Sequence, residues 1–182
     1  IRKRLRVGTG DGGGVDSGGI QSYNPVVMAK TILHHTSSLD GLLERLSPDP
    51  HLRGEEFERA TKWYLETDPA YSPELREVWL RKDWPGRWGP DIGIDLVAET
   101  HEGQLWAIQA KCYDPESTVP KSEIDSFLAA SSRPEFSHRL LISTGQITKN
   151  SESNLKDSDK STAFLLYQGL TESPVDWLAY LD

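Results

Sequence analysis

Two short apolar segments joined by a glycine-containing turn constrain this chain more than any other feature. Residues 94–98 read IDLVA and residues 105–110 read LWAIQA, and the three residues HEG follow Thr100 between them. Both segments have the length and composition of β-strands. A three-residue loop that ends in glycine is a common closure of a hairpin. The sequence therefore predicts an antiparallel β-hairpin here.

The turn also fixes which residues face each other across the hairpin. If Thr100 lies opposite Gln104, then Asp95 lies opposite Gln109, and Lys111 is two residues further along the same strand. Directly paired residues share a face of the sheet, as do residues two apart. A two-residue loop would instead oppose Asp95 to Ala110. The three-residue turn therefore predicts that the three polar side chains project from one face.

These polar side chains favour a divalent metal site. A carboxylate, an amide and an ammonium group on a sheet face are costly to desolvate unless they bind a ligand or each other. Asp95 and the side-chain oxygen of Gln109 are the hard ligands that Mg²⁺ prefers, and Lys111 suits charge stabilisation at a phosphate. The alternative is an ion pair of Asp95 with Lys111 at the end of the sheet, with Gln109 pointing outward.

The remaining segments predict an α/β fold. Residues 53–67 have the apolar spacing of a helix that ends before Pro69, and Glu58 lies at the edge of its apolar stripe, where it faces either solvent or the sheet. A further helix is expected near residues 122–128, with strands at 139–143 and 163–167. Short strands with intervening helices favour a three-layer core, a mixed sheet of four or five strands with helices on both faces.

The chain is expected to have three parts. Residues 1–23 are rich in glycine and cannot bury much apolar surface, so we expect a flexible or non-native segment. Residues 24–50 are expected to form a helical extension in front of the core. Residues 51–182 are expected to form the core domain. Because the first residue is Ile, we expect a fragment of a larger protein.

Composition limits how the chain can meet its partners. The net charge of −8 excludes a global positive field that would attract nucleic acid, so contact with DNA would have to be local or assisted. The single Cys112 excludes an intramolecular disulfide and suits the reducing cytoplasm. No apolar run approaches the roughly 18 to 20 residues of a membrane span, so no membrane partner is expected.

Three short motifs carry a resemblance to a known superfamily. PD at 90–91, GID at 93–95 and QAK at 109–111 resemble the PD-(D/E)xK nucleases, in the Mrr-like branch where glutamine replaces the second acid. Residues 53 to about 150 are also similar to the amino-terminal nuclease domain of single-chain Type ISP restriction enzymes and related helicase-linked nucleases. The resemblance implies a restriction-endonuclease-like fold and a metal-dependent DNA endonuclease of a restriction or phage-defence system.

The resemblance also implies roles for individual residues. Asp95 and Gln109 would be metal ligands, Lys111 the catalytic lysine and Glu58 the acid from the first helix of the core. Asp91 is the alternative to Asp95, because it belongs to the literal PD motif. The expected cofactor is Mg²⁺, for which Mn²⁺ could substitute.

The strand that ends at Ser143 implies contacts with DNA. In the resembling families the corresponding segment lies near DNA, and Ser143, Thr144 and Lys149 suit phosphate contacts, although an ordinary polar loop is the alternative. Double-stranded DNA is the expected partner. Helicase and methyltransferase domains, which would bring ATP and S-adenosylmethionine, are expected elsewhere in the full-length protein. A second nuclease copy is expected if both strands are cut. The alternatives are a non-cleaving DNA-docking or interaction module with the same fold and a structure-specific junction nuclease.

Overall fold

The computed structural model describes residues 37–89 and 93–182. The predictions for residues 1–23, for most of the helical extension and for Asp91 therefore lie outside the described residues. The helices are α2 (Ser38–Leu43), α3 (Pro50–Thr67), α4 (Lys121–Ala130), α5 (Lys149–Lys156) and α6 (Tyr167–Glu172), with 3-10 turns at Arg81–Asp83 and Trp177–Leu181. The strands are β1 (Leu75–Leu80), β2 (Leu96–Thr100), β3 (Leu105–Lys111), β4 (Phe136–Ser143) and β5 (Ser161–Leu165).

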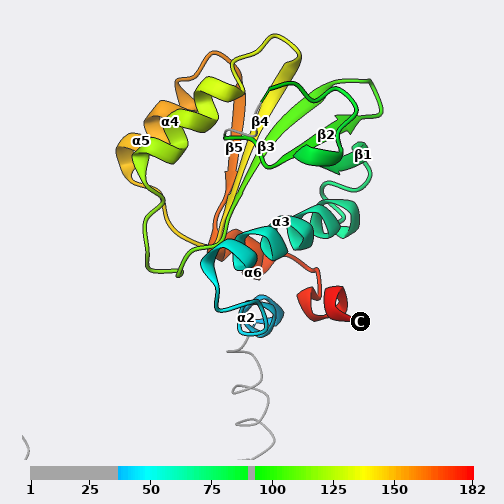
Figure 1. Ribbon diagram of the computed structural model, residues 1–182, viewed down its shortest axis with the longest axis vertical. Helices are drawn as coiled ribbons and strands as arrows, with labels where there is room; N and C mark the ends of the chain where they lie inside the picture. The colour runs from blue at the N-terminus through cyan, green and yellow to red at the C-terminus, as the bar shows by residue number, and fades with distance from the viewer. Residues whose placement is uncertain (1–36, 90–92) are drawn as a thin grey trace, which may run out of the picture. The chain divides into compact units, whose positions relative to one another are not determined.

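The five strands form one mixed sheet in the order β1-β2-β3-β4-β5. β2 is antiparallel to both of its neighbours, β1 and β3, while β3, β4 and β5 run parallel to one another, because α4 and α5 make the crossovers between them. Figure 1 shows α4 and α5 together on one side of the sheet and α3 on the other. The predicted α/β class, with helices on both faces of a mixed sheet, is confirmed.

The two faces of the sheet bury separate hydrophobic layers. On the α3 side, Tyr64 stacks on Trp177 of the carboxyl-terminal 3-10 turn, with ring centroids 4.6 Å apart. The core there includes Leu39, Leu42, Phe57, Leu65, Leu96, Ile108 and Leu140. On the other side, the core includes Ile94, Val97, Ala107, Ile124, Phe127 and Leu141. Successive residues of β2 and β3 alternate between these layers, as side chains in a strand must.

The predicted turn of the β2–β3 hairpin is confirmed. The Thr100 amide donates to the Gln104 carbonyl at 2.9 Å, and Gly103 takes a φ of 79°. Glycine adopts this left-handed conformation without the steric cost that a Cβ would bring. The strands then pair in the predicted register from Glu99 with Leu105 to Leu96 with Ile108.

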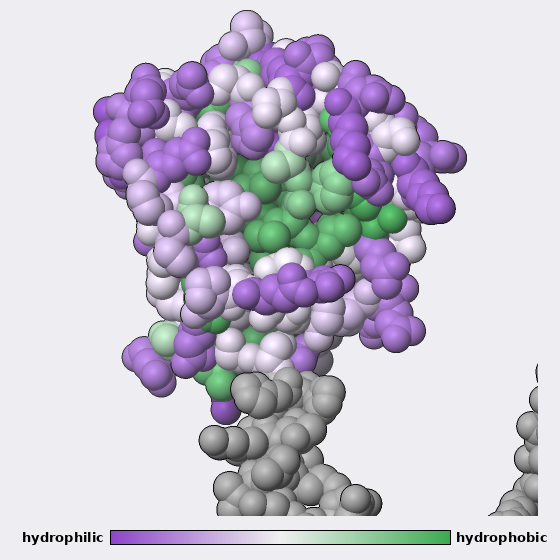
Figure 2. All heavy atoms as spheres, turned by 180° about the vertical axis from the view of Figure 1, so that it is seen from behind, coloured by the Kyte–Doolittle hydropathy of each residue, from purple (hydrophilic) through white to green (hydrophobic). Residues whose placement is uncertain are grey.

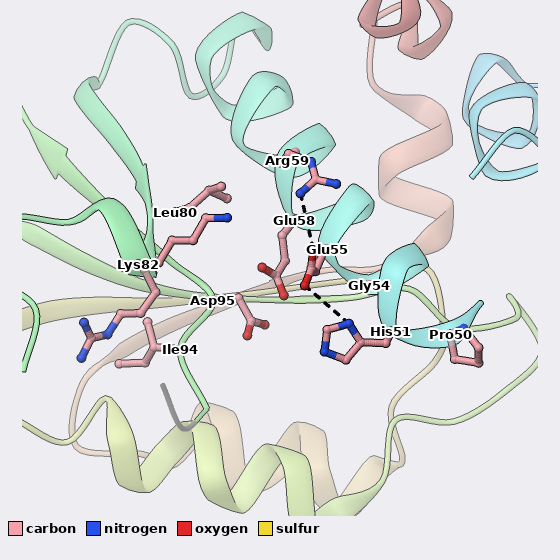
Figure 3. Close-up of a pocket in the computed structure, with 11 residues that line it drawn as sticks. Pro50, His51, Gly54, Glu55, Glu58, Arg59, Leu80, Lys82, Ile94 and Asp95 are labelled. Atoms are coloured by element: carbon pink, nitrogen blue, oxygen red, sulfur yellow. Dashed lines mark ion pairs between the residues drawn. The ribbon is translucent and has the colours of Figure 1, made fainter. Parts of the chain in front are cut away.

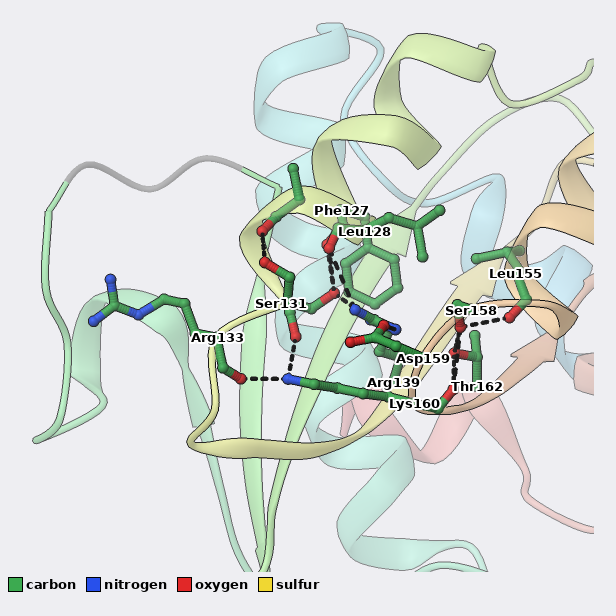
Figure 4. Close-up of polar contacts among 12 residues, drawn as sticks. Phe127, Leu128, Ser131, Arg133, Arg139, Leu155, Ser158, Asp159, Lys160 and Thr162 are labelled. Atoms are coloured by element: carbon green, nitrogen blue, oxygen red, sulfur yellow. Dashed lines mark hydrogen bonds and ion pairs between the residues drawn. The ribbon is translucent and has the colours of Figure 1, made fainter.

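A buried arginine ties α4 to the parallel half of the sheet (Figure 4). Arg139 on β4 is only 1% exposed. Its Nε donates to Ser131 Oγ at 2.6 Å, its Nη1 to Asp159 Oδ1 at 2.9 Å and its Nη2 to the Leu128 carbonyl at 3.4 Å. A planar guanidinium can meet three acceptors in different directions, so this buried charge has partners for each of its nitrogens.

Arg139→Lys is expected to destabilise the fold by about 2 to 3 kcal/mol, because one ammonium cannot replace the fork of contacts in a buried position. Urea unfolding measures this loss. Arg76→Lys is the control, because the Arg76 side chain is more than half exposed in its ion pair with Glu99 and its replacement is expected to change stability by less than about 0.5 kcal/mol. Equal effects of the two substitutions would contradict the anchoring role of Arg139.

The opposite view of the molecule shows hydrophobic residues reaching the surface in the middle of one face, with hydrophilic residues around them (Figure 2). The large hydrophobic residues classed as exposed among the described residues are Leu52 and Leu181, at 51% and 43%. Within the described ranges, no helix has the length and apolar character needed to cross a membrane.

Candidate active site

Asp95 lies where the regular hairpin pairing ends. Its amide donates to the Ile108 carbonyl at 2.9 Å, and its carbonyl accepts from the Arg81 amide at 2.8 Å. Its side-chain Oδ2 accepts from the Ala110 amide at 2.9 Å. Asp95 therefore leaves the simple pairing with Gln109 that the turn predicts, but its carboxylate is fixed across the end of β3.

The backbone before Asp95 is shaped by a close approach of α4. Gly93 has a φ of 76°, and a Cβ at this position would lie 2.7 Å from the Ser126 carbonyl oxygen. A side chain would therefore strain the backbone and collide with the helix. Glycine at position 93 lets the segment that carries Asp95 pack directly against α4.

Lys111 lies between two carboxylates. Its Nζ is 3.6 Å from Asp95 Oδ2 and 3.8 Å from Glu123 Oε2 on α4. The Tyr113 hydroxyl donates to Glu123 Oε1 at 2.6 Å, while Glu123 Oε2 is buried without a hydrogen bond to the described residues. Burial and the neighbouring Glu123 carboxylate raise the pKa of Tyr113 to about 12, so the phenol stays a donor.

Glu123 and Tyr113 were missed by the sequence analysis. An acidic residue in the first turn of a helix is common because it interacts favourably with the helix dipole, so Glu123 carries no distinctive local signal. Only the crossover packing of α4 brings it to Lys111.

Gln109 is buried, with 2% of its surface exposed. The alternative in which Gln109 points outward is therefore wrong, although the ion pair of Asp95 with Lys111 exists at 3.6 Å. The Gln109 side-chain oxygen, Oε1, has no hydrogen-bond partner in the described part of the chain. A buried acceptor without a partner is costly unless a ligand satisfies it.

The donors at this site fit a hard divalent cation. Asp95 offers a carboxylate and Gln109 an amide oxygen that residues 37–89 and 93–182 leave unsatisfied, and Mg²⁺ prefers both ligand types. The described residues hold no cluster of three or more His, Cys, Asp or Glu side chains that could bind a metal. The ion would therefore complete its shell with backbone oxygens, water or substrate, as Mg²⁺ usually does.

Glu58 faces Asp95 from α3 across a hollow of about 410 Å³ (Figure 3). Burial, followed by the negative charge of Asp95, raises the pKa of Glu58 to about 7, and Lys111 partly offsets the rise. Burial likewise raises the pKa of Asp95, against the opposing effects of Lys111 and the Ala110 amide. Of the two orientations open to Glu58, the structure shows the one toward the sheet, where Glu58 lies beside Asp95 and Asp95 lies beside Lys111.

The raised pKa of Glu58 predicts a pH dependence of stability. A carboxyl group with a higher pKa in the folded state holds more protons when folded, so its stabilising contribution is lost as pH rises from 4.5 to about 7. The full shift corresponds to about 3 kcal/mol, and we expect about 1 kcal/mol because Glu58 is only partly buried and solvent screens it.

Urea unfolding of the parent and of Glu58→Gln, in EDTA across this pH range, measures the effect. As pH rises from 4.5 to about 7, the unfolding free energy of the parent is expected to fall by about 1 kcal/mol relative to that of Glu58→Gln. A difference that is constant with pH would contradict the raised pKa.

The three residues predicted to contact DNA differ in their exposure to solvent. Ser143 and Thr144 are fully buried. Thr144 Oγ1 accepts from the Tyr113 amide and donates to the Tyr113 carbonyl, and Ser143 Oγ accepts from the Gly145 amide. The Thr144 hydroxyl therefore holds the segments that follow β3 and β4 together, whereas the Ser143 hydroxyl stabilises the turn that follows β4. Lys149 is exposed at the start of α5, where a phosphate contact stays a prediction.

Comparison with known proteins identifies the family. A restriction endonuclease family model matches residues 66–181. The chain belongs to this family. The matched region includes Asp95, Gln109 and Lys111, whereas Glu58 precedes it. The sequence matches no curated protein.

Two solved structures share the fold. The ATP-dependent Type ISP restriction-modification enzyme LlaBIII, bound to DNA, is 31% identical over 78% of this chain, with a TM-score of 0.64. The MspJI restriction endonuclease, in complex with a 27-mer oligonucleotide, is 19% identical over 72% of this chain, with a TM-score of 0.52. This chain spans 9% of the length of the first protein and 30% of the second. It is thus similar to one part of each larger enzyme.

Proposed function

We propose that this chain is a Mg²⁺-dependent DNA endonuclease domain that hydrolyses phosphodiester bonds. The observation that carries the proposal is the buried Gln109 Oε1, which no residue of the described ranges satisfies, at the sheet end that also presents Asp95 and Lys111. The restriction endonuclease family supports the reaction class.

Each residue of the site has a chemical task in this proposal. Asp95 and Gln109 would hold Mg²⁺ through their side-chain oxygens, and the bound ion would supply Lewis acidity. The Lys111 ammonium would stabilise the negative charge that develops on the phosphate. Glu123, itself held by Tyr113, would keep the Lys111 side chain in position when Asp95 binds the metal. Glu58 would add a carboxylate on the side of α3.

The domain's charge supports a role as the cleavage module of a larger restriction or phage-defence enzyme. A net charge of −8 is unfavourable for finding DNA by long-range attraction. Linked helicase and methyltransferase domains, with their ATP and S-adenosylmethionine, would deliver DNA to the site. The likeness to part of a Type ISP enzyme supports this arrangement. Meeting a second nuclease copy would allow both strands to be cut.

Nicking of supercoiled plasmid tests the activity. At low salt and high protein concentration with Mg²⁺ or Mn²⁺, we expect the parent to nick, and Asp95→Ala or Lys111→Ala to lower the rate by about a hundredfold or more. Asp125→Asn is the control, because it removes an exposed carboxylate from α4 that pairs with Lys121. Nicking by Asp95→Ala at the parent rate would contradict the site. A folded but inert parent would favour a non-cleaving docking module.

Gln109→Leu separates metal binding from folding. In EDTA, this variant is expected to be as stable as the parent or up to about 1 kcal/mol more stable, because it removes a buried acceptor for which the described part of the chain supplies no donor. Thermal unfolding with and without Mg²⁺ is the measurement, and Mg²⁺ is expected to stabilise the parent more than Gln109→Leu. Equal stabilisation of the two proteins by Mg²⁺ would exclude Gln109 as a ligand.

A further inference from the structure

Gly54 stands in the second turn of α3, where the fold itself does not require a glycine. Glycine within a helix is destabilising relative to alanine. A Cβ built at Gly54 would meet no protein atom within 4 Å, whereas one at Gly93 would collide with α4. The described residues thus give no steric reason for glycine at position 54.

Gly54 lies between two hollows that contain the candidate catalytic groups. One hollow, of about 410 Å³, is lined by Gly54, Glu58 and Asp95. The other, of about 440 Å³, is lined by Gly54, Glu58 and Lys111. Because Gly54 and Glu58 line both, the two hollows adjoin along α3. The uncovered helix backbone at Gly54 therefore lies beside the site.

A cationic side chain lines each hollow. Lys82 lines the hollow that holds Asp95, and Figure 3 shows it across from Glu58 and Arg59 on α3. Arg53 lines the hollow that holds Lys111. Neither Lys82 nor Arg53 forms an ion pair with another residue of the described ranges. Arg53 also interacts with the Cys112 thiol, but no carboxylate of the described ranges pairs with either cation, so both can contact an anionic ligand on either side of Glu58 and Asp95.

We propose that these hollows form one groove in which the sugar–phosphate backbone of a DNA strand passes over Gly54. Lys82 and Arg53 contact phosphates on either side of the phosphodiester that meets Asp95 and Lys111. A Cβ at position 54 would project into the space that the DNA strand occupies. Contact with DNA therefore explains why this position is a glycine. Such contacts position DNA without reading its sequence. The inference rests on the proposed function, because it places the substrate of that same site.

A size series at position 54 tests the groove. We measure melting temperature and, by fluorescence anisotropy in EDTA at low salt, affinity for a short duplex oligonucleotide. Gly54→Ala is expected to raise the melting temperature by about 2 to 4 °C, because alanine favours the helix. The same change is expected to weaken DNA binding about threefold, and Gly54→Leu about tenfold or more, as clashes displace the phosphate contacts. Parent-like binding and nicking by Gly54→Leu would overturn the proposal.

Charge variants test the phosphate contacts separately. Lys82→Ala and Arg53→Ala are each expected to reduce the slope of log affinity against log salt by about 0.9, because each removes one phosphate contact. Lys62→Ala is the matched control, since Lys62 is on α3, pairs with Glu66 and lines neither hollow. It is expected to leave the slope nearly unchanged. Equal slopes for all three variants would overturn the assignment of Lys82 and Arg53.

The outcomes separate this inference from the nuclease proposal. If the parent does not nick but Gly54→Leu and Lys82→Ala weaken DNA binding, the groove stands and the activity fails. If the parent nicks in an Asp95-dependent way but the Gly54 series changes neither binding nor nicking, the activity stands and the groove fails. If the parent shows neither nicking nor DNA binding, both fail.

Discussion

The hydrogen bond from the Ala110 amide to the Asp95 carboxylate holds the site together. It replaces the backbone pairing that the hairpin would otherwise make at this point, and it fixes a partly buried carboxylate at the end of β3. Lys111 and Gln109 both belong to that strand, so their positions relative to Asp95 follow from this one contact. The close approach of α4 at Gly93 then limits how far the segment can move.

Some buried polar side chains have all their hydrogen-bond partners within the described residues, and others do not. Arg139 is buried with partners for each of its nitrogens, and its contacts account for the packing of α4 on the parallel strands. Gln109 is buried with an oxygen that the described residues leave unsatisfied. Burial also raises the pKa of Glu58 to about 7. Satisfied polar groups serve the fold, whereas groups kept at an energetic cost mark the place where a ligand is expected.

The same reasoning connects the charge of the chain with its groove. An overall acidic domain gains nothing from long-range attraction to DNA, so local features must supply the contact. Lys82 and Arg53 line the two hollows that meet at Gly54. A glycine that the fold does not require points to a ligand at close range. Recognition by backbone contacts suits a module whose target would be chosen by other domains.

Turn chemistry and strand alternation are local properties, so the amino-acid sequence alone predicts the hairpin turn, the register of β2 with β3 and the mixed α/β class. Its motifs also identified the family and named Asp95, Gln109, Lys111 and Glu58 as candidates. The burial of Gln109, the contact of Thr144 with the segment after β3 and the approach of Glu123 to Lys111 follow from the fold alone. These depend on how α3 and α4 pack against the sheet, and no local pattern encodes a contact between segments that meet only after folding.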